Sequence, residues 1–143
     1  MSLSETDGVE YARTIDQWLK ESEAYEIMEL ELYRLRRYGI SGTVALTGMA
    51  DMPFIRFLQN QVRQSDYVIP LGRNHCFLIF SSTDLVHAKM AMQRIITDYK
   101  PLVGTDKTAL VGLKAEEEVE DTLKRLLVLF ILDHKASIVV DEP

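Results

Sequence analysis

The sequence predicts an α+β fold in which a βαββαβ core follows a helical N-terminal region. Short apolar runs rich in β-branched and aromatic residues alternate with longer segments whose apolar residues recur at helical spacing. Two of the short runs are separated by only four turn-forming residues, which indicates a β-hairpin. The chain has 143 residues, of which 47% are hydrophobic and 27% charged. This is the size and balance of one globular domain.

Residues 9–38 are expected to be helical, because the segment lacks Pro and Gly and is rich in helix formers. The apolar pattern is interrupted at Ser22, so the segment is interpreted as two helices or one amphipathic helix. Residues 1–8 are polar and small, and we expect a disordered or tag-derived tail. An apolar patch on the helix predicts self-association, or packing on the chain's own sheet; it consists of Ile15, Trp18 and Leu19.

The elements in the first half of the βαββαβ core are predicted from turn and helix signals. A short β-branched run between glycines predicts a buried strand, and a proline then falls where the first turn of a helix tolerates it. The expected elements are a strand at 43–49, a helix from about Pro53 to about Ser65, and hairpin strands at 67–71 and 76–80 around the turn 72–75.

The second half is bounded by helix caps and breakers. Ser81 to Asp84 are good N-cap residues, and Pro101 and Gly104 interrupt the chain later. The expected elements are a helix at 85–99, a strand at 108–113, a helix at 116–135 and a strand at 137–140. This order predicts a sheet that contains antiparallel strands and carries its helices on one face, as in ferredoxin-like and cyclase-palm folds.

Composition excludes several classes of protein. Cys76 is the single cysteine, so no intrachain disulfide can form, which fits a cytoplasmic protein. The net charge of −6 argues against a nucleic-acid partner, because such surfaces need clustered cations. The longest apolar run, 126–132, is far shorter than the roughly 20 residues of a membrane span. Direct membrane insertion is therefore not expected.

The stretch VRQSDYVIPLGRNHCFLIF, from Val62 to Phe80, resembles the GGDEF (diguanylate cyclase) family. In that family an R-x-x-D pair precedes the GGDEF turn by five residues, and here Arg63, Asp66 and Gly72 keep this spacing. The resemblance implies a bacterial GGDEF-like domain at 23–143, shortened, with a helical extension at 9–22.

The departures from the family pattern imply that the domain is degenerate. Only the first glycine of the GGDEF turn survives, since the turn reads Gly72, Arg73, Asn74, His75 and Cys76. Gly48 and Ala50 stand where the resemblance places the strand-end carboxylates, and Asp51 is the only acid nearby. Because Mg²⁺ needs hard oxygen ligands, neither a metal site nor cyclase catalysis is expected. The chain also has room for one helix where the family has two, so its guanine-binding segments are missing.

The resemblance also implies a cyclic di-GMP site at Arg63 and Asp66, supported by Arg94. A guanidinium can contact phosphate or guanine in bidentate fashion, and a carboxylate can accept from guanine N–H groups. The alternative is that Arg63 and Asp66 only cap and pair locally at a helix-to-strand corner.

His75 and Cys76 raise the question of a metal or thiol site. Adjacent residues of a strand point to opposite faces, and no second His/Cys pair lies at ligand spacing. Cys76 is therefore predicted to be a core residue, and no metal or cofactor is expected.

The leading hypothesis is a non-catalytic signalling or regulatory module that retains the fold and transmits signals through its N-terminal helix, a partner surface or a residual cyclic di-GMP site. Two alternatives stay open: a nucleotidyl cyclase with an altered metal site, and a purely structural dimerisation domain. Partner contact or homodimerisation is expected through the N-terminal helix.

Overall fold

A computed structural model describes residues 5–48, 51–99, 107–132 and 138–141. Met49, Ala50, Pro101, Gly104 and the segment 133–137 lie outside the described residues. The described helices are α1 (Glu5–Glu21), α2 (Ala24–Tyr38), α3 (Met52–Gln61), α4 (Leu85–Asp98) and α5 (Val119–Leu132). The described strands are β1 (Thr43–Thr47), β2 (Tyr67–Leu71), β3 (His75–Phe80), β4 (Thr108–Gly112) and β5 (Ile138–Val140).

The strands form one mixed sheet in the order β2-β3-β1-β4-β5. Only the β4–β5 pair is parallel, and the other neighbours are antiparallel. The α+β class and the βαββαβ order are therefore confirmed. The three inner strands are buried on both faces, which explains why they read as continuous apolar runs rather than as alternating ones.

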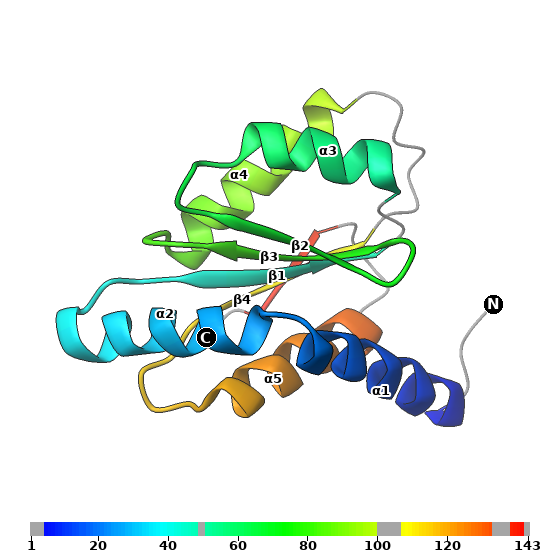
Figure 1. The fold of residues 1–143 in the computed structure, drawn as a ribbon, viewed down its shortest axis with the longest axis horizontal. Helices are drawn as coiled ribbons and strands as arrows, with labels where there is room; N and C mark the ends of the chain where they lie inside the picture. Colours follow the sequence, from blue (N-terminus) through cyan, green and yellow to red (C-terminus); the bar gives the residue numbers. More distant parts are fainter. Residues whose placement is uncertain (1–4, 49–50, 100–106, 133–137, 142–143) are drawn as a thin grey trace.

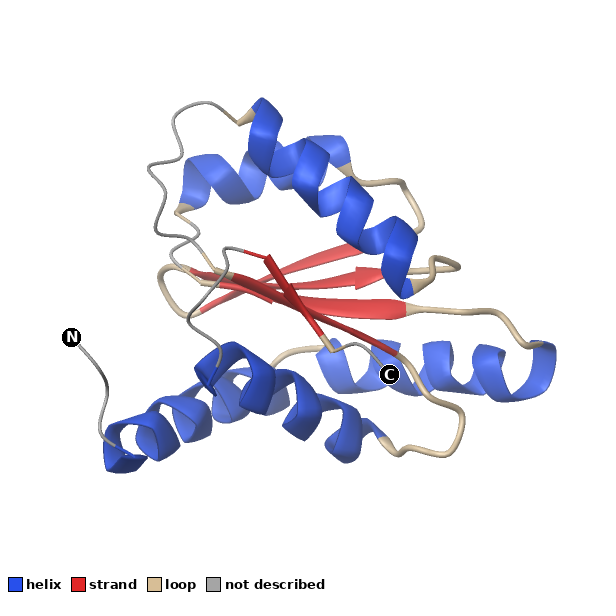
Figure 2. Cartoon of the chain, turned by 180° about the vertical axis from the view of Figure 1, so that it is seen from behind, coloured by secondary structure: helices blue, strands red, loops and turns tan. Residues whose placement is uncertain are grey.

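The two helices of the βαββαβ core cover one face of the sheet, as expected for that core. Helices α3 and α4 lie on one face of the sheet, while α1, α2 and α5 lie on the other (Figure 1; Figure 2 shows the same layers from behind). The three-layer arrangement has a physical reason: successive residues of the inner strands point to opposite faces and are apolar on both, so each face of the sheet needs a cover.

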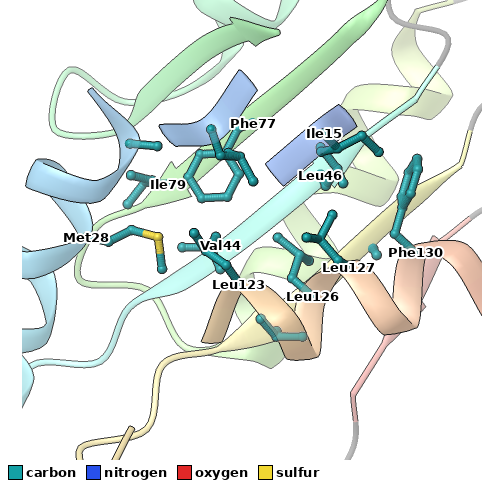
Figure 3. Close-up of a cluster of buried hydrophobic side chains, with 14 of the residues drawn as sticks. Ile15, Met28, Val44, Leu46, Phe77, Ile79, Leu123, Leu126, Leu127 and Phe130 are labelled. Atoms are coloured by element: carbon teal, nitrogen blue, oxygen red, sulfur yellow. The ribbon is translucent and has the colours of Figure 1, made fainter. Parts of the chain in front are cut away.

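Each face has its own apolar core, and the strands contribute alternate residues to the two. Val44 and Leu46 of β1 and Phe77 of β3 pack against α1, α2 and α5 (Figure 3). Ala45 of β1 and Cys76 of β3 pack instead against α3 and α4. Cys76 is fully buried, so its prediction as a core residue is confirmed.

The N-terminal segment forms two helices, one of the two interpretations left open by its sequence. The break falls at Ser22, whose hydroxyl donates to the Leu19 carbonyl and accepts from the Ala24 N–H. Helix α1 begins at Glu5, so residues 5–8, expected to be part of a tail, are helical. Gly39 ends α2 in the left-handed conformation.

The apolar patch of α1 is a core surface, which corrects the prediction that it is exposed for self-association. Ile15 and Leu19 are fully buried and belong to the core between the sheet and helices α1, α2 and α5. Trp18 is half-buried and packs against the same core. The alternative, packing on the chain's own sheet, is confirmed.

Caps explain where the described helices begin and end. Asp51 and Asp84 accept hydrogen bonds from the first-turn N–H groups of α3 and α4. Helix α3 ends at Gln61 rather than near Ser65, because Val62 is already extended. Helix α5 starts at Val119 instead of 116. Among the described residues, no helix has the length and apolarity to cross a membrane.

Candidate functional site

One end of the sheet collects the segments that the GGDEF resemblance identifies with nucleotide chemistry. Thr47, the last residue of β1, pairs with Cys76 at the start of β3 and with Thr108 at the start of β4. The buried hydroxyls of Thr47 and Thr108 are hydrogen-bonded at 3.0 Å. The hairpin turn and Gly48 therefore lie at the same end of the sheet, which we call the nucleotide end.

Aromatic side chains from two helices close around the glycines of the nucleotide end. A Cβ atom added to Gly48 would lie 2.9 Å from Cζ of Phe130, on α5. A Cβ atom added to Gly72 would lie 2.7 Å from two ring carbons of Trp18, on α1. Gly72 also has a φ of 56°, which side-chain-bearing residues rarely adopt. A side chain at either glycine would therefore collide with an aromatic ring.

His75 sits within this aromatic cluster. Its ring centroid is 5.3 Å from that of Trp18, 5.5 Å from that of Tyr11 and 6.2 Å from that of Phe130. Its Nε2 is hydrogen-bonded to the Tyr11 hydroxyl, and its buried Nδ1 has no hydrogen-bond partner among the described residues. Burial lowers the pKa of His75, because the imidazolium would lose its hydration. We refer to Tyr11, Trp18, His75 and Phe130 as the aromatic plug.

Neighbouring Cys76 faces the other side of the sheet, as expected for adjacent residues in a strand. Burial raises the pKa of its thiol to about 12. A thiol with this pKa is almost entirely protonated at neutral pH and is a poor metal ligand or nucleophile. His75 and Cys76 therefore do not form a joint site.

The residues at the nucleotide end do not fit the Mg²⁺ site that the resemblance implies. Gly48 has no side chain, and the Asp51 carboxylate is engaged as the N-cap of α3. Arg73 is exposed, and Asn74 is half-buried. Within the described ranges, no group of three or more His, Cys, Asp or Glu side chains is placed to hold a metal ion. Between β1 and β2 the described residues form the single helix α3, which agrees with the missing second helix.

The opposite end of β2 holds the predicted R-x-x-D pair. The Asp66 carboxylate accepts from the backbone N–H groups of Arg63 and Ser81, each at 3.0 Å. It also accepts two longer bonds, both 3.4 Å, from the Arg63 guanidinium. A carboxylate has about four acceptor positions, so the chain itself uses those of Asp66. The Asp66 side chain is 4% exposed.

Arg63 and Arg94 remain accessible beside this corner. The Arg63 side chain is 57% exposed, although its guanidinium also donates to the Ser81 carbonyl and the Thr83 hydroxyl. A hollow of about 160 Å³ lies between α3 and α4, and all three predicted site residues line it. We call this the corner hollow; its lining is Gln61, Val62, Arg63, Asp66, Phe80, Thr83, Ala91, Arg94 and Ile95.

Sequence reasoning missed a buried carboxylate that adjoins the corner. Glu31 of α2 is 1% exposed and accepts from the Ser81 hydroxyl at 2.8 Å and from Arg34 at 3.4 Å. Ser81 therefore joins Glu31 to Asp66, since its N–H donates to the Asp66 carboxylate. Spacing along the chain gives no signal for this contact, because Glu31 and Ser81 are far apart in sequence.

Similarity to solved structures defines the fold. The diguanylate cyclase SiaD of Pseudomonas aeruginosa, solved with its activator SiaC, matches with a TM-score of 0.63 and 20% identity over 82% of this chain. This chain spans only 56% of that SiaD chain. The GGDEF domain of DgcB from Caulobacter crescentus, in complex with c-di-GMP, matches with a TM-score of 0.68 and 7% identity, covering 82% of this chain and 88% of that one.

A third match is PelD of Pseudomonas aeruginosa in complex with c-di-GMP. Its TM-score is 0.53 and its identity 14%, over 68% of this chain and 40% of that one. No protein-family model and no curated protein matches the sequence. The chain has a GGDEF-like fold.

The aromatic plug predicts a pH dependence of stability. Because burial holds the pKa of His75 below its ordinary value of 6.5, the unfolded chain binds a proton more readily than the folded one. This contribution to stability is present above pH 6.5 and is lost as the pH falls toward the lowered pKa of the folded state.

The measurement is urea unfolding at neutral and mildly acidic pH. The wild type should lose more stability on acidification than His75→Gln, while His87→Gln, at an exposed histidine that pairs with the Asp84 carboxylate, should lose at least as much as the wild type. Equal losses in the wild type and His75→Gln would contradict the assignment.

Proposed function

We propose that this chain is a non-catalytic regulatory module of bacterial cytoplasmic signalling, built on a GGDEF-like fold. One observation carries the proposal: the aromatic plug occupies the nucleotide end of the sheet. The alternative of a working cyclase needs room and metal ligands at the place where Phe130 and Trp18 contact the glycines.

Two physical requirements of phosphoryl chemistry argue against the cyclase alternative. Phosphates approach glycine turns through exposed backbone N–H groups, but the Trp18 ring lies over Gly72. Metal ions must neutralise the charge that develops on the transferred group, but the turn offers Arg73 and His75 in place of carboxylates. Undocking α1 would remove the first obstacle and leave the second.

The proposal is tested by calorimetric titration of the chain with GTP in the presence of Mg²⁺. We expect no saturable heat, because the plug fills the nucleotide end. The matched variant Trp18→Ala reports whether the ring alone prevents binding, and we expect no Mg²⁺-dependent heat from it either. Saturable Mg²⁺-dependent binding by the wild type would overturn the proposal.

A second candidate function, cyclic di-GMP binding, is favoured by the corner hollow. Arg63 and Arg94 place two exposed guanidinium groups on its rim, and guanidinium groups bind phosphate and guanine in bidentate fashion. The hollow of about 160 Å³ is smaller than the roughly 300–1,000 Å³ of an enclosing ligand pocket. A dinucleotide would therefore lie mostly on the surface, with one group in the hollow.

Within this second candidate, Asp66 has a positioning role. Its acceptor positions are already used by the corner, so it holds Arg63 in place rather than offering a free carboxylate to guanine. The same contacts also support the alternative that Arg63 and Asp66 only cap and pair locally between α3 and β2. Binding measurements on Arg63 variants separate the two alternatives.

A further inference from the structure

The turn between β3 and α4 carries two of the groups that hold Arg63. The Arg63 guanidinium donates through Nη2 to the Ser81 carbonyl and to the Thr83 hydroxyl. The Thr83 hydroxyl in turn donates to the Ser81 carbonyl at 2.9 Å. Because both acceptors belong to this turn, the position of the turn sets the position of the Arg63 guanidinium.

The backbone of the turn has an unusual conformation at its centre. Ser82 has a φ of 55°, in the left-handed region that residues with a side chain rarely adopt. Such a conformation persists where the surrounding contacts hold it in place. The contacts that anchor the turn therefore decide where Arg63 lies.

Two side-chain hydrogen bonds anchor the turn from outside the corner hollow. The Thr43 hydroxyl, at the start of β1, donates to the Thr83 carbonyl at 2.8 Å. The Ser81 hydroxyl donates to the Glu31 carboxylate, also at 2.8 Å, while the Ser81 N–H donates to Asp66. Glu31 belongs to α2, on the face of the sheet opposite to α3 and α4 (Figure 1). The anchor at Ser81 therefore joins the two helical layers.

The Glu31 carboxylate is a firm anchor because it is buried and charged. It is 1% exposed, and its second donor is Arg34, one turn further along α2, at 3.4 Å. Hydrogen bonds to a carboxylate are stronger than those between neutral groups. Leaving a buried acceptor without its donor is costly, so the Ser81 hydroxyl is held toward α2.

These contacts leave one nitrogen of the Arg63 guanidinium for a ligand. Nε and Nη2 donate to the Asp66 carboxylate, and Nη2 also contacts the turn. Nη1 has no hydrogen-bond partner in the part of the chain that the structure describes. Since the Arg63 side chain is 57% exposed and lines the corner hollow, Nη1 is the nitrogen that an acceptor there can reach.

We propose that Glu31 is a positioning residue for Arg63: it holds Ser81, and Ser81 holds the guanidinium with Nη1 left for the ligand. The inference rests on the cyclic di-GMP binding proposed above as the second candidate function. Neither Glu31 nor Ser81 lines the corner hollow, so both act without touching the ligand. The position of α2 and ligand binding at Arg63 are then coupled, and this coupling acts in both directions.

The test is calorimetric titration of Glu31→Gln and Ser81→Ala with cyclic di-GMP. Ser81→Ala removes the hydroxyl and keeps the backbone contacts to Arg63 and Asp66. Each variant should bind roughly two- to thirtyfold more weakly than the wild type, the range for substitutions that change a coupling from outside the site. The double variant should bind about as the weaker single variant does, because both substitutions break the same hydrogen bond. Glu29→Gln, at an exposed glutamate of α2, is the matched control and should bind as the wild type does.

Urea unfolding of each variant separates positioning from stability. A merely structural role of Glu31 would lower the free energy of unfolding and leave the affinity of the folded chain unchanged. Wild-type affinity in both Glu31→Gln and Ser81→Ala would therefore overturn the proposal.

A second readout needs no ligand, so it separates failure of this inference from failure of cyclic di-GMP binding. In both variants the Nε–Hε NMR signal of Arg63 should shift and its heteronuclear NOE should fall, while the signal of Arg56, an exposed arginine of α3, stays unchanged. If the wild type gives no binding heat, the second candidate function fails and this signal alone decides the positioning role. An Arg63 signal that is the same in the wild type, Glu31→Gln and Ser81→Ala would overturn it.

Discussion

Replacing Phe130 by alanine is expected to lower the free energy of unfolding by about 3–5 kcal/mol, the range for truncating a buried Phe. Phe130 is 5% exposed and packs in the core between the sheet and α1, α2 and α5 (Figure 3). Its ring also lies against Gly48, at the nucleotide end. The loss combines the transfer of a large apolar side chain with the cavity left at the end of β1.

The contact between Phe130 and Gly48 makes a second substitution informative. Gly48→Ala should cost about 1–3 kcal/mol, because its Cβ would lie too close to the ring and the core would be overpacked. In the Phe130→Ala background the close contact is gone, and His75 Nε2 at 3.8 Å is only an ordinary contact of the added methyl group. The double variant should therefore be more stable than the sum of the single effects predicts, with a coupling energy of roughly 0.5–3 kcal/mol.

Urea unfolding of the four proteins measures this cycle. Gly112→Ala provides a matched control, since Cβ there would have only an ordinary contact, 3.7 Å from Leu85, and should show no coupling with Phe130→Ala. Additive effects of Gly48→Ala and Phe130→Ala would show that Phe130 does not fill the nucleotide end.

Replacing Arg63 by alanine is expected to weaken cyclic di-GMP binding by roughly ten- to more than a hundredfold, since a hydrogen bond to a charged group contributes about 1.5–3 kcal/mol. Binding should also weaken as salt rises, because guanidinium groups meet phosphates. Calorimetric titration up to high ligand concentration is the measurement. Arg94→Ala should reduce affinity in the same direction.

Controls must separate a loss of cyclic di-GMP binding from a loss of stability at the corner between α3 and β2. Arg63 donates to the Ser81 carbonyl and the Thr83 hydroxyl, so urea unfolding of Arg63→Ala should accompany the titration. Arg56→Ala is the matched variant, because Arg56 is an exposed arginine of the same helix, α3, away from the corner hollow. If the wild type gives no binding heat, or Arg63→Ala binds as the wild type does, Arg63 and Asp66 only stabilise the corner.

Much of the fold could be predicted from local signals. The hairpin strands, the N-cap at Asp84 and the burial of Cys76 follow from turn chemistry, capping and strand alternation. The cover of the second face by α1, α2 and α5 was not predicted, although the continuous apolar runs of β1, β3 and β4 carried the signal. Such runs indicate strands covered on both sides.

The candidate site was harder to predict, because its contents come from distant parts of the chain. The loss of acids at the turn was visible in the sequence, and so were the three residues that line the corner hollow. The aromatic plug at the nucleotide end was not visible in the sequence. Its residues Tyr11, Trp18 and Phe130 come from α1 and α5 and contact His75 only in the folded protein. Apolar periodicity assigns such residues to a core without saying which strand end they cover.

The most direct measurement of the central claim is turnover of GTP by the isolated chain with Mg²⁺ and, separately, with Mn²⁺, with the product identified by mass. The account predicts that no cyclic di-GMP accumulates with either metal. A known diguanylate cyclase assayed in parallel verifies that the conditions support the reaction. Accumulation of cyclic di-GMP that depends on the chain and on the metal would contradict the account.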